Sequence, residues 1–467
     1  MRLLRAPAAP YTPTHAMASS TPPPGLLRAL GDRDIALITI GSVLGSAIFI
    51  AAADVPRAVP HPLLVLLLWT AGGLVTIAGA LTYAELGGMF PRAGGQYQYL
   101  KEAYGPLWGF LFGWASFLVV MSGGIASLAV AFGEYLGSFV PFFSTANILL
   151  AVGGWQVSGG QVAAALAIAG LTAINYVGLK EGAGLQNAVT VAKVGALLAI
   201  AVLGLLMPAP IHADWSPALP PSATASAFGV AMIAVFWSYD GWYCATFSAG
   251  ETRDPGRNLP RGLIAGTIAV TVLYLLANVA YFRVLSMEAI AATPRIGEAA
   301  GAALFGPAGG RLIGAAVVLS TFGCLSATIL TCARIYQPMA EDGVFFPALA
   351  RVHPRHRTPG ASLVAQGLWS IVLACSGTYE QLYTYAVFAA FVFHAATAAA
   401  VIHLRRTRPE APRPYRTWGY PWVPIVFAAA SVAFVANTLI ERPMESFLGL
   451  ALVALGLPAY AWWRRKR

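Results

Sequence analysis

The chain has 467 residues, of which 58% are hydrophobic and only 10% are charged, and its mean hydropathy is +0.68. Because a soluble domain carries about 25% charged residues, this composition excludes a soluble protein and predicts an all-α membrane protein with many spans. All four cysteines lie in apolar segments, which argues against a disulfide framework. His353 and His356 have no Cys or carboxylate cluster nearby, so we expect neither a metal site nor a cofactor.

Twelve apolar segments are long enough to cross a membrane as helices, which takes about twenty residues. They cover approximately residues 34–53, 62–88, 106–137, 160–179, 185–207, 223–249, 261–283, 308–336, 361–377, 380–403, 422–440 and 446–463. Residues 1–30 precede them and are rich in Pro, Ala, Ser and Thr, so we expect a disordered cytoplasmic N-terminus there. Met17 within it is an alternative initiator to Met1.

Positive charge is distributed unequally between the two sides of these spans. If the N-terminus is cytoplasmic, the inner segments hold 23 of the 29 Lys and Arg residues, the outer segments hold five, and Lys193 lies inside a span. Cytoplasmic loops of membrane proteins carry this excess, so we expect both termini in the cytoplasm and a location in the plasma (inner) membrane. The asymmetry also accounts for the net charge of +10 without a nucleic-acid partner.

The first span contains the sequence Gly41-Ser-Val-Leu-Gly-Ser-Ala-Ile-Phe49, with two Gly and two Ser near its middle. Gly costs a helix interior about 1 kcal/mol relative to Ala, and backbone groups freed by a break find no water in hydrocarbon. One interpretation is a broken helix that lines a cavity, where free N–H groups can hold a carboxylate. The alternative is close packing, because small residues four positions apart let two helices touch.

Four ionisable residues lie within the spans or at their ends, where an unpaired charge is costly. Glu85 ends span two and Glu134 nears the outer end of span three, so we expect water to solvate both of them. Lys193 and Asp240 lie deeper in spans five and six. These two residues need a structural or functional partner.

The sixth span contains a second interruption, Trp237-Ser-Tyr-Asp-Gly-Trp242, in which Asp-Gly is a turn signal. Two Gly-interrupted spans at matching positions of two halves indicate a transporter binding site, which favours the cavity interpretation. We therefore expect a five-plus-five inverted repeat, with broken helices one and six and two further C-terminal helices. Residues 31–210 would form the first repeat, 211–404 the second, and 405–467 the last two spans with a basic C-terminus.

This arrangement predicts how an amino acid is held between the two breaks. The half-helix that begins after Gly45 would direct its N–H groups at a carboxylate. The carbonyl groups left over near Val43 and Trp237 would accept hydrogen bonds from an ammonium group.

Four stretches of sequence also match a known pattern. They are Gly41 to Phe49; Tyr83-Ala-Glu-Leu-Gly-Gly-Met-Phe-Pro-Arg-Ala-Gly-Gly-Gln-Tyr97; Trp237 to Trp242 with Glu251 and Asn258-Leu-Pro260; and Arg334-Ile-Tyr with Ala340-Glu-Asp-Gly343 and Val352-His-Pro354. Together they resemble the amino acid–polyamine–organocation superfamily, close to the L-type amino acid transporters and their bacterial relatives. The resemblance covers spans one to ten and is far weaker for the last two.

The resemblance implies a role for each residue that matches these motifs. Gly45, Ser46 and Ala47 would offer N–H groups to the substrate carboxylate, while Val43 and Trp237 would offer carbonyls to its ammonium group. Trp237 would also cover the bound substrate as an aromatic gate. Ala47 departs from the pattern, because the family usually has Gly there and Ala tolerates positive φ poorly, so we expect a smaller pocket or a different break.

The same resemblance implies a role for Lys193, since sodium-independent members place a Lys where sodium-dependent relatives bind an ion. Its ammonium would replace that cation against the backbone of span one; the alternative is a stem that extends toward the cytoplasm. Trp237, Tyr239 and Asp240 belong to a pattern that resembles transporters of cationic amino acids and cystine. Asp240 would pair with a cationic side chain, cap the second half of span six, or offset Lys193.

The sequence thus predicts a secondary active transporter, not an enzyme, whose partners are an amino acid substrate and the lipid bilayer. We expect alternating access without sodium, as an exchanger or a proton-coupled symporter. No metalloprotease, nucleophile-elbow or nucleotide-binding motif lies in a suitable setting for a membrane enzyme. The alternative within this fold is a transporter of polyamines, other organic cations or nucleobases, which would not need the N–H groups around Gly45. The particular amino acid, the driving ion and the oligomeric state stay open.

Overall fold

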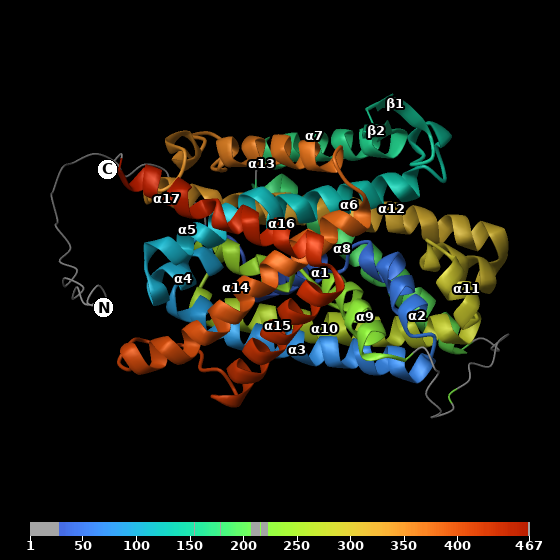
Figure 1. The fold of residues 1–467 in the computed structure, drawn as a ribbon, viewed down its shortest axis with the longest axis horizontal. Coiled ribbons are helices and arrows are strands. Elements are labelled where there is room, and N and C mark those ends of the chain that lie inside the picture. Colours follow the sequence, from blue (N-terminus) through green and yellow to red (C-terminus); the bar gives the residue numbers. More distant parts are fainter. Residues whose placement is uncertain (1–27, 154, 178, 207–214, 216–222, 466–467) are drawn as a thin grey trace.

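The computed structural model describes residues 28–465, except 154, 178, 207–214 and 216–222, and nearly all of this part is helical (Figure 1). Nine of the described helices are long and apolar enough to cross a membrane. They are α3 (Pro62–Met89), α5 with α6 (Pro106–Ala115 and Met121–Leu136), α7 (Gly159–Val177), α8 (Leu179–Leu206), α10 (Pro255–Val284), α12 (Ile296–Glu341), α14 (Tyr379–Thr407), α15 (Trp422–Glu441), and α16 with α17 (Pro443–Ala454 and Gly456–Arg465). Two interrupted spans and the shorter α13 (Gly360–Ala374) complete the predicted twelve.

The first and sixth spans are each interrupted in the middle, as predicted. After α1 (Asp32–Val43) the chain continues through two 3-10 turns, η1 (Ala47–Phe49) and η2 (Ala51–Ala53), into α2 (Asp54–Ala58). After α9 (Ala225–Tyr239) it turns at Gly241 and continues as the 3-10 helix η5 (Trp242–Glu251). Gly241 has a left-handed φ of 94°, which glycine adopts without the steric cost that a Cβ atom brings.

The first span lies in the middle of the bundle, between two groups of helices (Figure 1). α1 contacts α8, α10, α12 and η5. On one side α6, α7, α12 and α13 pack against one another, and on the other α3 packs against α9, α10 and α15. The backbone groups freed by the break are therefore surrounded by protein, which is the condition under which irregular backbone is tolerated at membrane depth.

The observed helices differ from the predicted spans mainly at their ends. α12 begins at Ile296, well before the predicted start at 308, and contains a kink at Gly306, where φ is 71°. An antiparallel hairpin of β1 (Ile148–Val152) and β2 (Trp155–Ser158) lies between spans three and four. Short helices, α4 (Gln96–Tyr104) and α11 (Met287–Ala292), lie in two other connections.

The structure describes the N-terminal segment from Arg28 onward. Of the expected disordered residues 1–30, those up to 27, including Met17, lie outside the described residues, as does the expected repeat boundary at 210. Ala29 and Leu30 both donate backbone hydrogen bonds to the carbonyl of Glu251, at 2.9 and 3.0 Å, and Arg253 N–H donates to the carbonyl of Leu30 at 2.8 Å. These bonds tie residues 29 and 30 to the end of η5.

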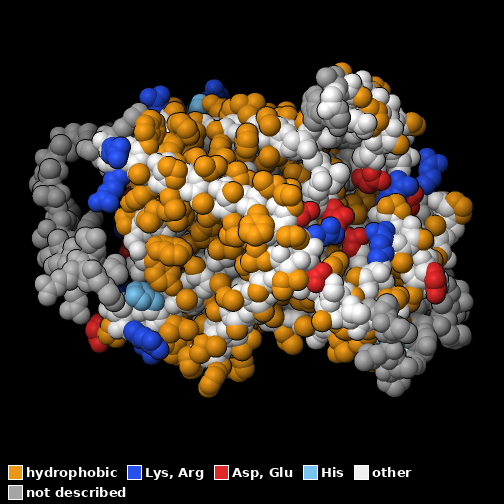
Figure 2. Space-filling model, in the orientation of Figure 1, with side chains coloured by type: hydrophobic (Ala, Val, Ile, Leu, Met, Phe, Trp, Pro, Cys, Tyr) orange, Lys and Arg blue, Asp and Glu red, His pale blue; other side chains and the backbone are white. Residues whose placement is uncertain are grey.

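Apolar side chains cover most of the face shown in Figure 2, and the charged side chains gather toward its two ends. Large apolar residues are exposed on several helices, among them Leu74 on α3, Leu312 on α12 and Leu368 on α13. Soluble monomers rarely expose a continuous apolar patch larger than a few hundred Å². The protein is an integral membrane protein with many spans.

Glu85 corrects one prediction. Water does not solvate its carboxylate, which is buried near the end of α3. Arg405 donates to both carboxylate oxygens, at 2.9 and 2.7 Å, and the backbone N–H of Thr417 donates at 2.7 Å. Burying a charge is costly unless it is paired and hydrogen-bonded. The sequence pattern around Glu85 could not reveal partners that lie 320 and 332 positions away.

Candidate functional site

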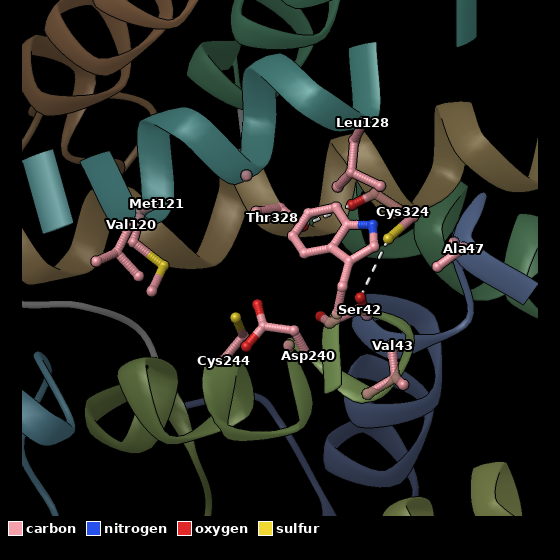
Figure 3. A pocket seen from close by; sticks show the side chains of 14 residues that line it. Ser42, Val43, Ala47, Val120, Met121, Leu128, Asp240, Cys244, Cys324 and Thr328 are labelled. Atoms are coloured by element: carbon pink, nitrogen blue, oxygen red, sulfur yellow. Dashed lines mark hydrogen bonds between the residues drawn. The ribbon is translucent and has the colours of Figure 1, made fainter. Parts of the chain in front are cut away.

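A small cavity lies where the two interrupted spans meet (Figure 3). Its wall comes from the break after α1, the break after α9, and the facing sides of α6 and α12. The lining residues are Ser42, Val43, Gly45, Ala47, Val120, Met121, Gly124, Leu128, Trp237, Asp240, Gly241, Cys244, Cys324 and Thr328. A water-sized sphere can move through about 30 Å³ of this space, which is room for no more than a few water molecules. An amino acid can therefore enter only if the surrounding helices move apart.

Two glycines allow the interrupted segments to pack closely against each other and against α6 and α12. A Cβ atom on Gly241 would lie 2.7 Å from the carbonyl oxygen of Ser42, so any side chain there would push the two breaks apart. A Cβ atom on Gly45 would lie 3.0 Å from the sulfur of Cys324 and 3.1 Å from Leu128. The glycine-rich stretch of span one thus both breaks the helix beside a cavity and permits close packing, which combines the two interpretations made from the sequence.

The break in span one leaves backbone N–H groups without partners. Within the described residues, the N–H groups of Ser46, Ala47 and Ile48 donate no hydrogen bond, because the bonds of η1 begin with Phe49 N–H donating to the carbonyl of Ser46 at 2.9 Å. Ala47 lines the cavity and does not have a positive φ. The methyl group of Ala47 is therefore accommodated without the strain that a left-handed conformation would impose.

The carbonyl groups at the breaks are more occupied than predicted. The carbonyl of Val43 accepts hydrogen bonds from the hydroxyl of Tyr274 on α10, at 2.9 Å, and from Gly45 N–H, at 2.7 Å. The carbonyl of Trp237 accepts only from Asp240 N–H, at 3.0 Å, among the described groups. Because a carbonyl oxygen has two lone pairs, Trp237 retains the capacity to accept from an ammonium group and Val43 does not.

An aromatic layer closes the cavity toward the end of the molecule that carries the β1–β2 hairpin. The indole N–H of Trp237 donates to the hydroxyl oxygen of Tyr379 at 2.9 Å, and the Ser46 hydroxyl lies 3.5 Å from the same oxygen. The ring of Trp237 stacks on that of Tyr383, with centroids 5.4 Å apart and planes inclined by 15°. These contacts join both breaks to the first turns of α14.

The carboxylate of Asp240 lacks a cationic partner. Its Oδ2 accepts a long hydrogen bond from the hydroxyl of Tyr243 at 3.5 Å, and its buried Oδ1 has no partner within the described part of the chain. None of the ion pairs found there includes it, so it does not neutralise Lys193. It does not cap η5 either, because the N-cap residue is Gly241 and no side chain caps this helix. Figure 3 shows its carboxylate directed toward Cys244 and Met121.

Lys193 on α8 restores a hydrogen bond that the break removes. In a continuous helix the carbonyl of Gly41 would accept from Gly45 N–H, but that N–H bonds to the carbonyl of Val43 instead. The ammonium of Lys193 donates to the carbonyl of Gly41 at 2.6 Å. Its side chain is only 1% exposed, so its stem does not extend to the surface.

Two predicted substrate contacts, Ser46 and Tyr239, are not part of the cavity wall. Ser46 lies in the chain between two lining residues, whereas Tyr239 is directed away. Its hydroxyl donates to the carbonyl of Trp69 on α3 at 3.0 Å. Its ring packs against those of Trp69 and Tyr274, with centroids 5.7 and 5.3 Å away. Tyr239 therefore belongs to the contact between α9, α3 and α10.

Several residues of the site carry no signal that our sequence analysis used. Met121, Cys324 and Thr328 line the cavity from α6 and α12, but apolar and small neutral residues are common in any span. Tyr379 and Tyr383 offer a usable signal, because aromatic residues four positions apart lie on one face of a helix. That spacing at the start of span ten could have indicated an aromatic contact with Trp237.

A buried ion pair joins α12 to the end of η5. Arg334 on α12 donates to Glu251 at the end of η5, with Nε–Oε2 and Nη2–Oε1 distances of 2.5 and 2.8 Å, and also to the carbonyl of Leu330. Neither charged side chain is exposed. Nearby, Tyr336 packs edge-on against Phe117, with centroids 5.2 Å apart.

Comparison with known proteins agrees with this arrangement. The sequence pattern of the family described as amino acid permease matches residues 30–449. The chain is 30% identical over 452 residues to the serine/threonine exchanger SteT of Bacillus subtilis (strain 168), covering 95% of this chain and 98% of that protein. It is 30% identical over 424 residues to the human (Homo sapiens) b(0,+)-type amino acid transporter 1, covering 90% and 84%. The human large neutral amino acids transporter small subunit 2 is 29% identical over 454 residues, covering 95% and 81%. With a cavity between two interrupted spans and a match along most of its length, this chain belongs to the amino acid permease family.

Proposed function

We propose that the protein is a secondary active transporter that moves amino acids across the membrane by alternating access and without sodium. One observation carries this proposal: two interrupted spans meet at a small cavity lined by Gly45, Ala47 and Trp237. The break leaves the N–H groups of Ser46 and Ala47 unbonded, and the Trp237 carbonyl can accept a second hydrogen bond. Donors and an acceptor at one cavity complement a molecule that carries both a carboxylate and an ammonium group. The names of the three relatives, an exchanger of serine and threonine and two transporters of amino acids, support amino acids as the substrate class.

In this proposal, residues at the two breaks bind the substrate and Lys193 stabilises the end of α1. Gly45, Ser46 and Ala47 bind the substrate carboxylate through their N–H groups, and the Trp237 carbonyl binds the ammonium group, because that of Val43 is already occupied. The ring of Trp237 covers the substrate. Lys193 holds the end of α1 through Gly41 and so replaces a sodium ion, which leaves exchange or proton coupling as the driving mechanism.

We further propose that the site prefers amino acids with a cationic side chain. The support is Asp240, whose Oδ1 is buried without a hydrogen bond and which lies in none of the described ion pairs. Leaving a buried charge uncompensated is strongly unfavourable, and ionisable residues inside a membrane usually serve transport or ligand binding. A substrate ammonium or guanidinium group that enters the cavity would supply the missing partner.

Uptake into proteoliposomes tests the proposed function. The purified protein is given a panel of labelled neutral, cationic and acidic amino acids, with sodium and pH gradients varied separately. We expect uptake of at least one amino acid when choline replaces sodium, and faster uptake when the same amino acid is present inside. Uptake of a polyamine or nucleobase, but of no amino acid, would instead support the alternative function.

The variant Asp240→Asn tests the proposed preference. We expect uptake of Lys or Arg to fall by about tenfold to a hundredfold, because hydrogen bonds to charged groups contribute roughly 1.5–3 kcal/mol, while uptake of neutral amino acids persists. Asn has nearly the same size and shape as Asp, so the variant removes the charge and leaves the backbone turn in place. Unchanged cationic uptake would show that the charge does not bind substrate, and an equal loss for both classes in folded protein would assign it to the shared machinery.

We propose that both termini and the loops near Arg257, Arg355 and Arg406 are cytoplasmic and that the protein resides in the plasma (inner) membrane. The support is the excess of Lys and Arg in these segments. Single cysteines at the exposed positions Arg355 and Ala146, on a background without the native cysteines, can be labelled in intact cells with an impermeant reagent. We expect labelling at Ala146 only; the reverse pattern would invert the topology.

We also propose that residues 31–210 and 211–404 are two repeats of opposite orientation, with 405–467 as an addition. The support is that each repeat begins with an interrupted span, α1 in one and α9 in the other. In an experimental structure, the two halves should superpose after a rotation of about half a turn about an axis in the membrane plane. Halves that superpose only in the same orientation would contradict the proposal.

A further inference from the structure

A second and larger cavity lies toward the end of the molecule that carries the β1–β2 hairpin and α11 (Figure 1). A water-sized sphere can move through about 550 Å³ of it, which is within the range of small-molecule sites. Tyr379 is part of its wall, and the hydroxyl of the same residue accepts the hydrogen bond from Trp237 in the wall of the central cavity. The contact between Tyr379 and Trp237 therefore lies between the two cavities.

The wall of this outer cavity is largely apolar surface, but it also holds several polar side chains, one of which is a carboxylate. Its polar lining residues are Glu134, Thr145, Gln156, Ser158, Gln161, Ser376, Thr378, Tyr379 and Gln381. No Lys or Arg is part of the described wall. The Oε2 atom of Glu134 accepts a hydrogen bond from the Thr145 hydroxyl at 2.7 Å, and Glu134 belongs to none of the ion pairs among the described residues. A half-buried carboxylate among neutral hydrogen-bonding groups favours a cation.

We propose that this outer cavity is a second binding site, which holds the ammonium group of an amino acid against Glu134 before the substrate reaches the central cavity. Gln and Ser side chains in the wall supply neutral hydrogen bonds to the rest of the molecule. Passage to the central cavity requires the hydroxyl of Tyr379 to leave Trp237 and Ser46. The order of the two sites along the transport path rests on the proposed function, whereas binding at the outer site does not.

The two sites differ in the chemistry that they require, which allows them to be separated. The central site uses N–H donors for a carboxylate, but the outer site needs only an ammonium group. L-Alaninamide keeps the ammonium group and lacks the carboxylate, so it should occupy the outer site without being transported. Propionamide has neither charge and is the matched control ligand.

Cys375 provides a native reporter, because it lines the outer cavity and is partly exposed. The other three cysteines, Cys244, Cys324 and Cys332, are at most 2% exposed. The experiment measures the rate at which N-ethylmaleimide modifies the purified protein in nanodiscs, where both faces are accessible, with Cys375→Ser defining the background. We expect saturating L-alaninamide to slow the modification of Cys375 several-fold and propionamide to leave the rate unchanged.

The variant Glu134→Gln identifies the counter-charge. We expect the concentration of L-alaninamide that gives half of the full protection to rise by about tenfold, which corresponds to ~1.4 kcal/mol. The matched control is Glu288→Gln on α11, which removes an exposed carboxylate at the same end of the molecule and is not part of this wall. It should leave the protection unchanged.

Two results would overturn the outer site. One is an unchanged rate of Cys375 modification when L-alaninamide is added to the wild-type protein, a result that does not depend on the folding of any variant. The other is equal protection of the wild-type protein and Glu134→Gln. Neither result depends on transport. If L-alaninamide protects Cys375 in a protein that takes up no amino acid, the outer site is supported and the proposed function is contradicted. If the protein takes up amino acids without such protection, the proposed function is supported and the outer site is contradicted.

Discussion

Replacing Lys193 by alanine should strongly reduce amino acid uptake while the protein stays folded. The substitution removes the ammonium group that bonds to the carbonyl of Gly41 at 2.6 Å, next to the break where α1 has already lost a helical hydrogen bond. An unsatisfied buried carbonyl costs roughly 1–3 kcal/mol. Because each 1.4 kcal/mol is a factor of ten, we expect uptake to fall by at least about tenfold, whether sodium is present or absent.

The measurement is initial uptake of the best wild-type substrate, together with the elution profile and melting temperature of the purified variant. Val191→Ala is a matched control, since Val191 lies two residues away on α8 and is 63% exposed. It should retain wild-type uptake. Full sodium-free activity in Lys193→Ala would reduce Lys193 to a packing residue and remove its role as a substitute for an ion.

Breaking the buried pair of Glu251 and Arg334 should cause the largest loss of stability. Glu251→Gln or Arg334→Met each leaves one charge unpaired in a place where neither side chain reaches solvent. Such a change is expected to cost about 3–5 kcal/mol. We therefore expect a clearly lower midpoint in thermal unfolding followed by circular dichroism, and less monodisperse protein after extraction.

Two further variants test whether the loss of stability comes from an unpaired charge that is buried or from the loss of an ion pair as such. The double variant Glu251→Leu with Arg334→Met should recover most of the lost stability, because replacing both partners by apolar groups is often neutral. Glu102→Gln removes one partner of the pair with Arg408, whose side chains are 32% and 47% exposed, and should change stability by less than about 1 kcal/mol. Equal losses in Glu251→Gln and Glu102→Gln would contradict the argument.

Local sequence was sufficient to predict both breaks. Gly45 and the Asp240-Gly241 pair are unusual inside apolar segments for reasons that act within a few residues, namely helix propensity and access to positive φ. The twelve spans follow from length and apolar content in the same way. The Lys193 contact with span one was expected from a family resemblance, because nothing near Lys193 in the sequence specifies its partner.

What the sequence could not predict depends on residues brought together from distant helices. Tyr274 occupies the carbonyl of Val43 from a position 231 residues away, and Tyr379 meets Trp237 across 142 residues. Glu85 is expected to be solvated if only its place at a helix end is considered. The helix ends and the short β hairpin were missed because small changes in packing decide them.

The backbone bonds of Ala29, Leu30 and Arg253 have a mechanical consequence. They fasten the chain that enters span one to the chain that leaves span six, and the guanidinium of Arg253 adds two bonds to the carbonyl of Ala29, at 2.9 and 2.6 Å. These bonds hold α1 and η5 together at one end of the bundle. In the proposed alternating access, the two segments would therefore move together. Any bending within spans one and six would then fall at the two glycine breaks, which lie beside the central cavity.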